Sequence, residues 1–204
     1  MKSKSLKIVS LVLAFSFIAI SLISGITNAS GFSDLNPTHW CYEKIMKFLD
    51  NDYVCGYEDG TFRADKTITR AEYVKIVNNF FGYPVNIEKQ DIEFSDVSEN
   101  DWFAGYVAEA VDRGYITGYP DGTFRPHNPI RRQEATVILS RILGIDKDEF
   151  PKDHKDGMIQ YSDADELEDW AYVAVNSYSV YNFINGYTDG TIKILQNVTR
   201  AETV

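Results

Sequence analysis

The chain has 204 residues, of which 44% are hydrophobic and 14% are aromatic. A chain of this length and composition can bury a core, which excludes an intrinsically disordered protein. Its formal net charge of −10 excludes a protein that binds nucleic acid through bulk electrostatics, because a phosphate backbone attracts basic surfaces. An anionic ligand would have to be held by a few locally placed cations.

Residues 1–29 differ in character from the rest of the chain. They combine a basic start with three lysines, an apolar run over residues 8–23, and small residues at the end. This pattern predicts a secretory signal peptide that is cleaved after Ala29. An uncleaved membrane anchor is the alternative, although the apolar run of about 16 residues is shorter than the roughly 20 that span a bilayer. Without the three lysines the mature chain has a net charge of about −13, which argues further against nucleic acid.

The two cysteines, Cys41 and Cys55, would both enter an oxidising compartment after export. A predicted helix lies between them and separates them by about 15 Å. A disulfide needs Cα atoms within about 7 Å of each other. We therefore expect unpaired thiols, and a bridge only if the chain doubles straight back.

Four short motifs recur three times in constant order. The copies are Phe32-Ser33-Asp34, Phe94-Ser95-Asp96 and Tyr161-Ser162-Asp163; Trp40, Trp102 and Trp170; 56–62 (GYEDGTF), 118–124 (GYPDGTF) and 186–192 (GYTDGTI); and 69–72 (TRAE), 131–134 (RRQE) and 199–202 (TRAE). Corresponding motifs lie 62 residues apart between the first two copies and 67 or 68 apart between the second and third. This register indicates tandem structural repeats.

The motifs divide the mature chain into three repeats. We predict them at 30–82, 94–144 and 161–204, joined by charged linkers at 83–93 and 145–160. The third copy stops about eight residues earlier in its last helix than the second copy does, so we interpret it as C-terminally incomplete. The sequence would then be a fragment or the product would be truncated, and a clipped helix would lower stability.

Each repeat is expected to contain two helices separated by a turn. In the second copy the first helix runs from Trp102 to about Arg113, capped by Asp101 and stopped by Gly114. The Asp-Gly pair then forms a turn, because glycine tolerates positive φ. The second helix begins at the Thr-Arg-Ala-Glu motif. Its apolar spacing predicts core positions at Val74, Val77, Phe80 and Phe81 in the first copy, and at Thr136, Leu139, Ile142 and Leu143 in the second.

A single repeat of this size cannot close its own apolar face. Three copies that share one core would give a single all-α body with pseudo-threefold symmetry.

The Thr-Arg-Ala-Glu motif carries the main functional signal. Its threonine and glutamate have the spacing of a capping box. Its arginine (Arg70, Arg132 and Arg200 in the three copies) occupies the first helical position, where the macrodipole disfavours a cation by about 0.3–1 kcal/mol. A guanidinium beside free backbone N–H groups makes an anion site. The alternative is an arginine that is salt-bridged to the aspartate of a neighbouring turn for structural reasons.

The tryptophan at each helix start (Trp40, Trp102 and Trp170) could stack on a sugar ring. The position more often belongs to a packing anchor, so packing is the favoured interpretation.

The turn aspartates do not fit an EF-hand, because the first and last positions of the loop are not acidic. The histidines show no metal spacing, and no nucleophile–base pair recurs among the copies. We therefore expect no metal, no cofactor and no catalytic site.

At these motifs the chain resembles the S-layer homology domain family, over about residues 32–204, and 68–72 (ITRAE) matches the family's helix start in full. The resemblance implies three helical repeats in a three-pronged spindle. It also implies non-covalent binding of secondary cell-wall polysaccharide, often pyruvylated, in grooves between repeats. Arg70, Arg132 and Arg200 would be the principal contacts, and the turn residues Asp59, Gly60, Asp121, Gly122, Asp189 and Gly190 would line the same grooves.

Two copies depart from the family pattern. The second reads Arg131-Arg132-Gln133-Glu134, which keeps the arginine and loses the capping threonine. The third has Ile192-Lys193 where the others have Phe-Arg, so we expect its groove to be degenerate.

The sequence thus predicts a secreted, non-catalytic module at the bacterial cell wall or S-layer surface. Its partner would be a secondary cell-wall polysaccharide or another peptidoglycan-associated glycan, with no stable membrane insertion after signal cleavage. The alternative is the N-terminal targeting region of a larger S-layer protein or extracellular glycan hydrolase.

Overall fold

The computed structural model describes residues 31–85, 92–145, 158 and 160–204. The predicted signal peptide and parts of both predicted linkers lie outside the described residues. The helices are α2 (Tyr42–Asp50), α3 (Arg70–Phe81), α4 (Ala104–Asp112), α5 (Arg132–Leu143) and α6 (Tyr172–Val180), with three short 3₁₀ helices, η1 (Ala164–Glu166), η2 (Asp169–Ala171) and η3 (Ala201–Thr203). Extended residues form isolated bridges but no strand within these ranges, so the predicted all-α class is confirmed.

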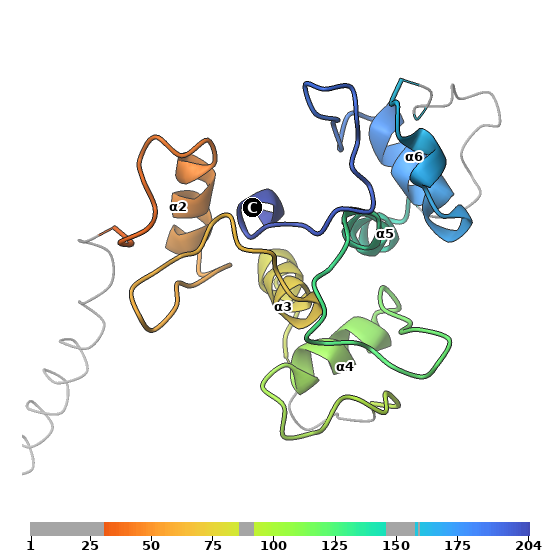
Figure 1. Ribbon diagram of the computed structural model, residues 1–204. Helices are drawn as coiled ribbons and strands as arrows, with labels where there is room; N and C mark the ends of the chain where they lie inside the picture. The colour runs from red at the N-terminus through yellow and green to blue at the C-terminus, as the bar shows by residue number, and fades with distance from the viewer. Residues whose placement is uncertain (1–30, 86–91, 146–157, 159) are drawn as a thin grey trace, which may run out of the picture.

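Three extended residues, one from each repeat, meet through a closed ring of backbone hydrogen bonds. The amide of Ile68 donates to the carbonyl of Val198 (2.9 Å), Val198 donates to Ile130 (2.9 Å), and Ile130 donates to Ile68 (3.1 Å). All three side chains are buried. Figure 1 shows α2, α4 and α6 around this centre, with α3, α5 and the C-terminal end between them. The repeats share core contacts in cyclic order, while the spindle shape itself stays a prediction.

The first helix of the second repeat begins later than predicted. α4 starts at Ala104, and Asp101 does not cap it. The Asp101 carboxylate instead accepts a hydrogen bond from the amide of Ser98 (2.8 Å), which closes the preceding turn. Gly114 follows the helix at φ 77°, in the left-handed conformation expected of a C-terminal stop.

The second helices bury less than their apolar spacing predicted. Val74, Val77 and Thr136 are buried as expected. Phe80 and Leu143 are 46% and 50% exposed, so their predicted core positions are wrong. Phe80 lies in the last turn of α3, where the other repeats do not cover it, and stacks on Phe48 with ring centroids 5.4 Å apart. Core burial is thus concentrated at the central ends of the two long helices.

The two cysteines are unpaired, as expected. Cys41 is buried at the start of α2, and its thiol donates to the carbonyl of Ala201 (3.2 Å) in the third repeat. Burial raises the pKa of this thiol. Cys41 therefore serves as a small packing residue between the first and third repeats, while Cys55 is exposed.

Within the described part of the chain, none of the helices combines the length and the hydropathy that crossing a bilayer requires.

Candidate functional site

Each Asp-Gly turn is held by the aspartate of the Phe-Ser-Asp motif in the same repeat. In the first repeat the Asp34 carboxylate accepts hydrogen bonds from the amides of Phe62 and Arg63, both at 2.7 Å. Asp96 and Asp163 do the same in the second and third repeats. The clamped residue Arg63 has a φ of 58°, which is costly for a side-chain-bearing residue and is imposed by this clamp. Both motifs are visible in the sequence, but the hydrogen bonds that join the Phe-Ser-Asp aspartate to the Asp-Gly turn could not be predicted from it.

The turn aspartates that the sequence placed in the grooves are exposed and bonded within their own turns. Asp59 pairs with Arg63 (2.5 Å), Asp121 with Arg125 (2.9 Å), and Asp189 with Lys193 (3.1 Å). Hydrogen bonds from the turn threonine and the basic side chain lower the pKa of each aspartate to about 2.

The third turn therefore keeps the contacts of the other two. Lys193 replaces the arginine at the same ion pair, and Ile192 is fully buried like Phe62 and Phe124. The glycines Gly60, Gly122 and Gly190 have φ values of 77°, 76° and 81°, which fixes them as turn residues. The expected degeneration of the third copy is not found at the turn.

The motif arginines reach across from one repeat into the next. Arg70 donates through Nε to the carbonyl of Phe124 (3.0 Å) in the second repeat. Arg132 donates through Nη2 to the carbonyl of Asn185 (2.9 Å) in the third. Arg200 donates through Nε to Phe62 (3.0 Å) in the first repeat, which closes the cycle. The arginines thus connect the three repeats in a ring.

The helix N-termini beside these arginines are not free anion sites, contrary to the sequence prediction. The amide of Arg70 donates to Asn128 (2.9 Å), and that of Ala71 donates to Pro126 (3.0 Å), both in the second repeat. The first two amides of α5 donate in the same way to Gln196 and Ile194 of the third repeat. These donors already have backbone acceptors, because the repeats dock on one another through their helix starts.

The alternative salt bridge to a turn aspartate is also wrong, since the carboxylate partner is a glutamate. Arg70 Nη1 lies 3.7 Å from Glu134, with side chains only 9% and 10% exposed. Its guanidinium lies 5.1 Å from the ring centroid of Tyr119, whose hydroxyl donates to the same Glu134. The capping glutamate therefore has two roles: it bonds the amide that starts its own helix, and it receives the arginine of the preceding repeat.

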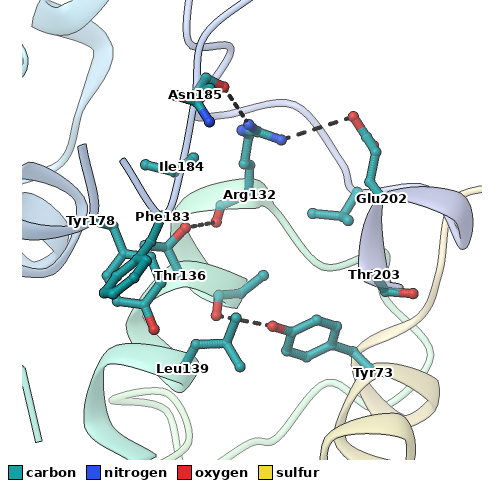
Figure 2. Close-up of a pocket in the computed structure, with 12 residues that line it drawn as sticks. Tyr73, Arg132, Thr136, Leu139, Tyr178, Phe183, Ile184, Asn185, Glu202 and Thr203 are labelled. Carbon is teal, nitrogen blue, oxygen red and sulfur yellow. Dashed lines mark hydrogen bonds and ion pairs between the residues drawn. The ribbon is translucent and has the colours of Figure 1, made fainter. Parts of the chain in front are cut away.

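Arg132 is the most open of the three arginines. Arg70 and Arg200 are 7% and 6% exposed, whereas the side chain of Arg132 is 19% exposed. Arg132 borders a pocket of about 210 Å³ between α5 and the third repeat, which we call the α5–α6 groove. The pocket is lined by Tyr73, Arg132, Ala135, Thr136, Leu139, Tyr178, Phe183, Ile184, Asn185, Val198, Glu202 and Thr203. Figure 2 shows Arg132 between Asn185 and Glu202 at one end of it.

The Nε of Arg132 is buried without a hydrogen-bond partner. The corresponding atoms of Arg70 and Arg200 donate to the turn carbonyls of Phe124 and Phe62. Arg132 also lies farther from its carboxylate partner, with Nη1 at 3.9 Å from Glu202. A buried donor without an acceptor is unfavourable, so this guanidinium retains capacity for an anionic or carbonyl group.

Two substitutions distinguish the α5–α6 contact from the α3–α4 contact. At the corresponding contact between α3 and α4, the hydroxyl of Tyr115 donates to the buried side chain of Asn78. In the second and third repeats the aligned residues are Ser140 and Phe183. Ser140 Oγ is buried and unpaired, and Phe183 is 60% exposed. The hydrogen bond between Tyr115 and Asn78 therefore has no counterpart between α5 and α6.

The three tryptophans are not packing anchors. Trp40, Trp102 and Trp170 are 66%, 54% and 53% exposed. The ammonium of Lys75 lies 5.6 Å from the Trp102 ring centroid, and the indole N–H of Trp170 donates to Glu168 (2.5 Å). Their exposed faces fit the sugar-stacking alternative, which stays a prediction.

The cyclic interlock of three similar helical units defines this chain as a tandem helical-repeat protein. It belongs to the S-layer homology domain family, whose domain matches residues 31–74, 93–136 and 160–204. The family predicted from the motifs is thereby confirmed.

Several characterised proteins contain similar repeats. The chain is 36% identical over 127 residues to cell surface glycoprotein 1 of Acetivibrio thermocellus, covering 58% of this chain and 6% of that protein. It is 37% identical over 123 residues to the cellulosome-anchoring protein of the same organism, covering 59% and 27%. It is 30% identical over 172 residues to an amylopullulanase of Thermoanaerobacterium thermosulfurigenes, covering 84% and 9%. The chain thus spans much less than two thirds of these relatives.

The family and its relatives named as surface-layer and cell-wall proteins indicate a protein of the bacterial cell-wall surface, as the sequence predicted. The signal peptide and its cleavage stay predictions.

Proposed function

We propose that this chain is a non-catalytic module that anchors a protein to the cell wall by binding an anionic secondary polysaccharide, and that the α5–α6 groove is its principal site. The proposal depends on the surroundings of Arg132. This motif arginine borders the α5–α6 groove and has a buried N–H without an acceptor. In a chain of net charge −10, a negative glycan needs such a local cation.

On the same grounds we propose a mainly structural role for Arg70 and Arg200. Both are more than nine-tenths buried, and their Nε atoms already donate to backbone carbonyls. A binding role for them, and for the turn residues predicted with them, would require the repeats to separate locally. We therefore place the anionic group of the glycan at Arg132.

Glu202 limits where that group can approach. Its carboxylate lies 3.9 Å from Arg132 Nη1 and accepts the hydroxyl of Tyr187 at 2.6 Å, so it neutralises one side of the guanidinium. An anion would be repelled there and favoured on the side of Nε, which has no hydrogen-bond partner.

The full-length protein can still combine this module with an enzyme. Relatives with the same repeats include the amylopullulanase and an exoglucanase of Acetivibrio thermocellus, of which this chain covers 9% and 15%. The alternative is thus a targeting region of an extracellular glycan hydrolase, and it predicts the same wall binding.

Sedimentation with purified cell-wall sacculi tests the proposal. Arg132→Gln should weaken binding by about tenfold or more, because a charge-assisted hydrogen bond is lost. Arg131→Gln is the matched control: it removes the same charge from the adjacent residue, whose side chain is 51% exposed and pairs with the surface carboxylate of Glu168. Equal binding by the two variants would contradict the proposal.

Sacculi stripped of their secondary polysaccharide provide the second comparison. The parent chain should lose binding to them, and binding that survives stripping would assign the ligand to peptidoglycan instead. Added salt should weaken binding to intact sacculi, since exposed charge pairs are screened within about 10 Å at 0.1 M.

A further inference from the structure

The α5–α6 groove contains a second unpaired polar group, the hydroxyl of Tyr178. Tyr178 lies on α6 and is 5% exposed, and its Oη is buried without a hydrogen-bond partner. Of the four such side-chain atoms in the described part of the chain, two belong to residues that line this pocket, Arg132 and Tyr178. Burial raises the pKa of Tyr178 to about 12, so the hydroxyl keeps its proton and can both donate and accept.

This hydroxyl is not part of the repeat pattern. The aligned residues are Phe48 in the first repeat and Ala110 in the second, and both lack a polar group. A phenylalanine at position 178 would fill the same volume without leaving an unpaired hydroxyl. Packing within the third repeat therefore does not account for the oxygen.

The surroundings of Tyr178 allow a ligand to reach it. Phe183 packs edge-on against the Tyr178 ring, with centroids 5.4 Å apart, and is 60% exposed. Exposed side chains change rotamer within picoseconds to nanoseconds. The Phe183 ring can thus move aside when a ligand enters, whereas Leu139 and Ile184 form more fixed apolar walls. Figure 2 shows Phe183 directly beside Tyr178 on the same side of the pocket.

The size of the pocket limits the ligand to a small unit. At about 210 Å³ it is smaller than the 300–1,000 Å³ typical of sites for drug-sized ligands. It suits one sugar ring rather than an oligosaccharide. Such a ring offers apolar C–H faces to the pocket walls and a hydroxyl group to Tyr178.

We propose that Tyr178 is the specificity-determining residue of the α5–α6 groove, where its hydroxyl hydrogen-bonds a ring hydroxyl of the glycan whose acidic group is held by Arg132. This inference rests on the proposed function, since it assigns a second contact to the same site. A site with a buried polar group discriminates strongly against ligands that cannot pair with it. The groove would therefore select an acidic sugar with a correctly placed hydroxyl over a simple anion.

Tyr178→Phe separates this role from a structural one. Binding to purified sacculi should weaken by about threefold to tenfold, the effect of one hydrogen bond. The thermal midpoint should stay unchanged or rise, because the substitution removes a hydroxyl that has no partner in the free chain.

Tyr115→Phe is the matched control. It removes a hydroxyl that is bonded to Asn78, so it should lower the thermal midpoint and leave sacculus binding unchanged.

The outcomes are distinguishable. Weaker binding without loss of stability supports the inference. Unchanged binding by Tyr178→Phe, together with weak binding by Arg132→Gln, would overturn the role of Tyr178 and keep the proposed function. A drop in both stability and binding would make Tyr178 structural, and unchanged binding by both variants would overturn both proposals.

Discussion

The α3–α4 interface and the α5–α6 groove are built from aligned residues, yet their polar groups are satisfied to different extents. At the first, Arg70 is bonded through Nε to a backbone carbonyl, and Tyr115 bonds Asn78. At the second, Arg132 Nε and Ser140 Oγ have no partner, and Phe183 lines the pocket. The motif is the same, so its presence does not distinguish a structural arginine from a binding one. The neighbouring residues decide between the two.

The comparison suggests how a repeat protein can acquire a binding site. Three identical interfaces would form a ring in which each arginine is fully hydrogen-bonded to the next repeat. Substitution of an interface pair, here by Ser140 and Phe183, removes one hydrogen bond from that ring and leaves Ser140 Oγ unpaired. Unpaired polar atoms at functional sites follow this pattern, because groups prepared for a ligand lack partners without it.

The largest expected effect on stability comes from breaking the α3–α4 interface. Arg70→Ala removes a guanidinium from a nearly buried pair with Glu134 and from the Phe124 carbonyl. Loss of one member of a buried pair costs about 3 kcal/mol or more. For a domain of this size, that lowers the thermal midpoint by about 6–12 °C.

Arg132→Ala is the comparison for that measurement. It loses a hydrogen bond to Asn185 at a more exposed position, so about 1 kcal/mol is expected. Thermal unfolding followed by circular dichroism measures both. If Arg132→Ala were as destabilising as Arg70→Ala, the two interfaces would be energetically alike and the contrast between them would fail.

The next largest effect is expected when the α5–α6 groove is converted into an interface like that between α3 and α4. The double substitution Ser140→Asn with Phe183→Tyr installs at the α5–α6 groove the pair that closes the α3–α4 interface. The new hydrogen bond should stabilise the chain by about 1 kcal/mol. It should also hold the side chain at position 183, which lines the pocket, in one place and so reduce sacculus binding at least tenfold. Each single substitution lacks its partner, so neither should reproduce the gain in stability; a double variant that binds like the parent would locate the ligand elsewhere.

Sequence could predict the parts of this protein that depend on local chemistry. The helix start at Arg70 and the capping box of Thr69 and Glu72 follow from a four-residue motif, and both are present. The turns follow from their glycines. The second copy also keeps half of its box without the threonine, because Glu134 still accepts the amide of Arg131 (2.8 Å).

The rest depends on contacts between repeats, which local motifs do not encode. Arg70 meets Phe124 across 54 residues and Arg200 meets Phe62 across 138, and these distances close only when the three-repeat ring forms. The prediction of free helix N-termini failed for this reason. Differences between aligned residues are the part of the groove that the sequence does contain. Tyr178, for example, differs in polarity from its aligned residues Phe48 and Ala110.

The smallest expected effect is the pH dependence of the turn aspartates, which all three repeats share. The folded pKa of Asp59, Asp121 and Asp189 is about 2, below the value of about 3.9 in an unfolded chain. A carboxyl whose pKa is lower in the folded state stabilises fully above the unfolded pKa and loses that contribution as pH falls through the folded pKa. The turns should therefore weaken between about pH 4 and pH 2. Thermal midpoints at pH 5, 3 and 2 should fall less steeply in a triple Asp→Asn variant than in the parent, and identical slopes would show that these ion pairs do not couple to folding.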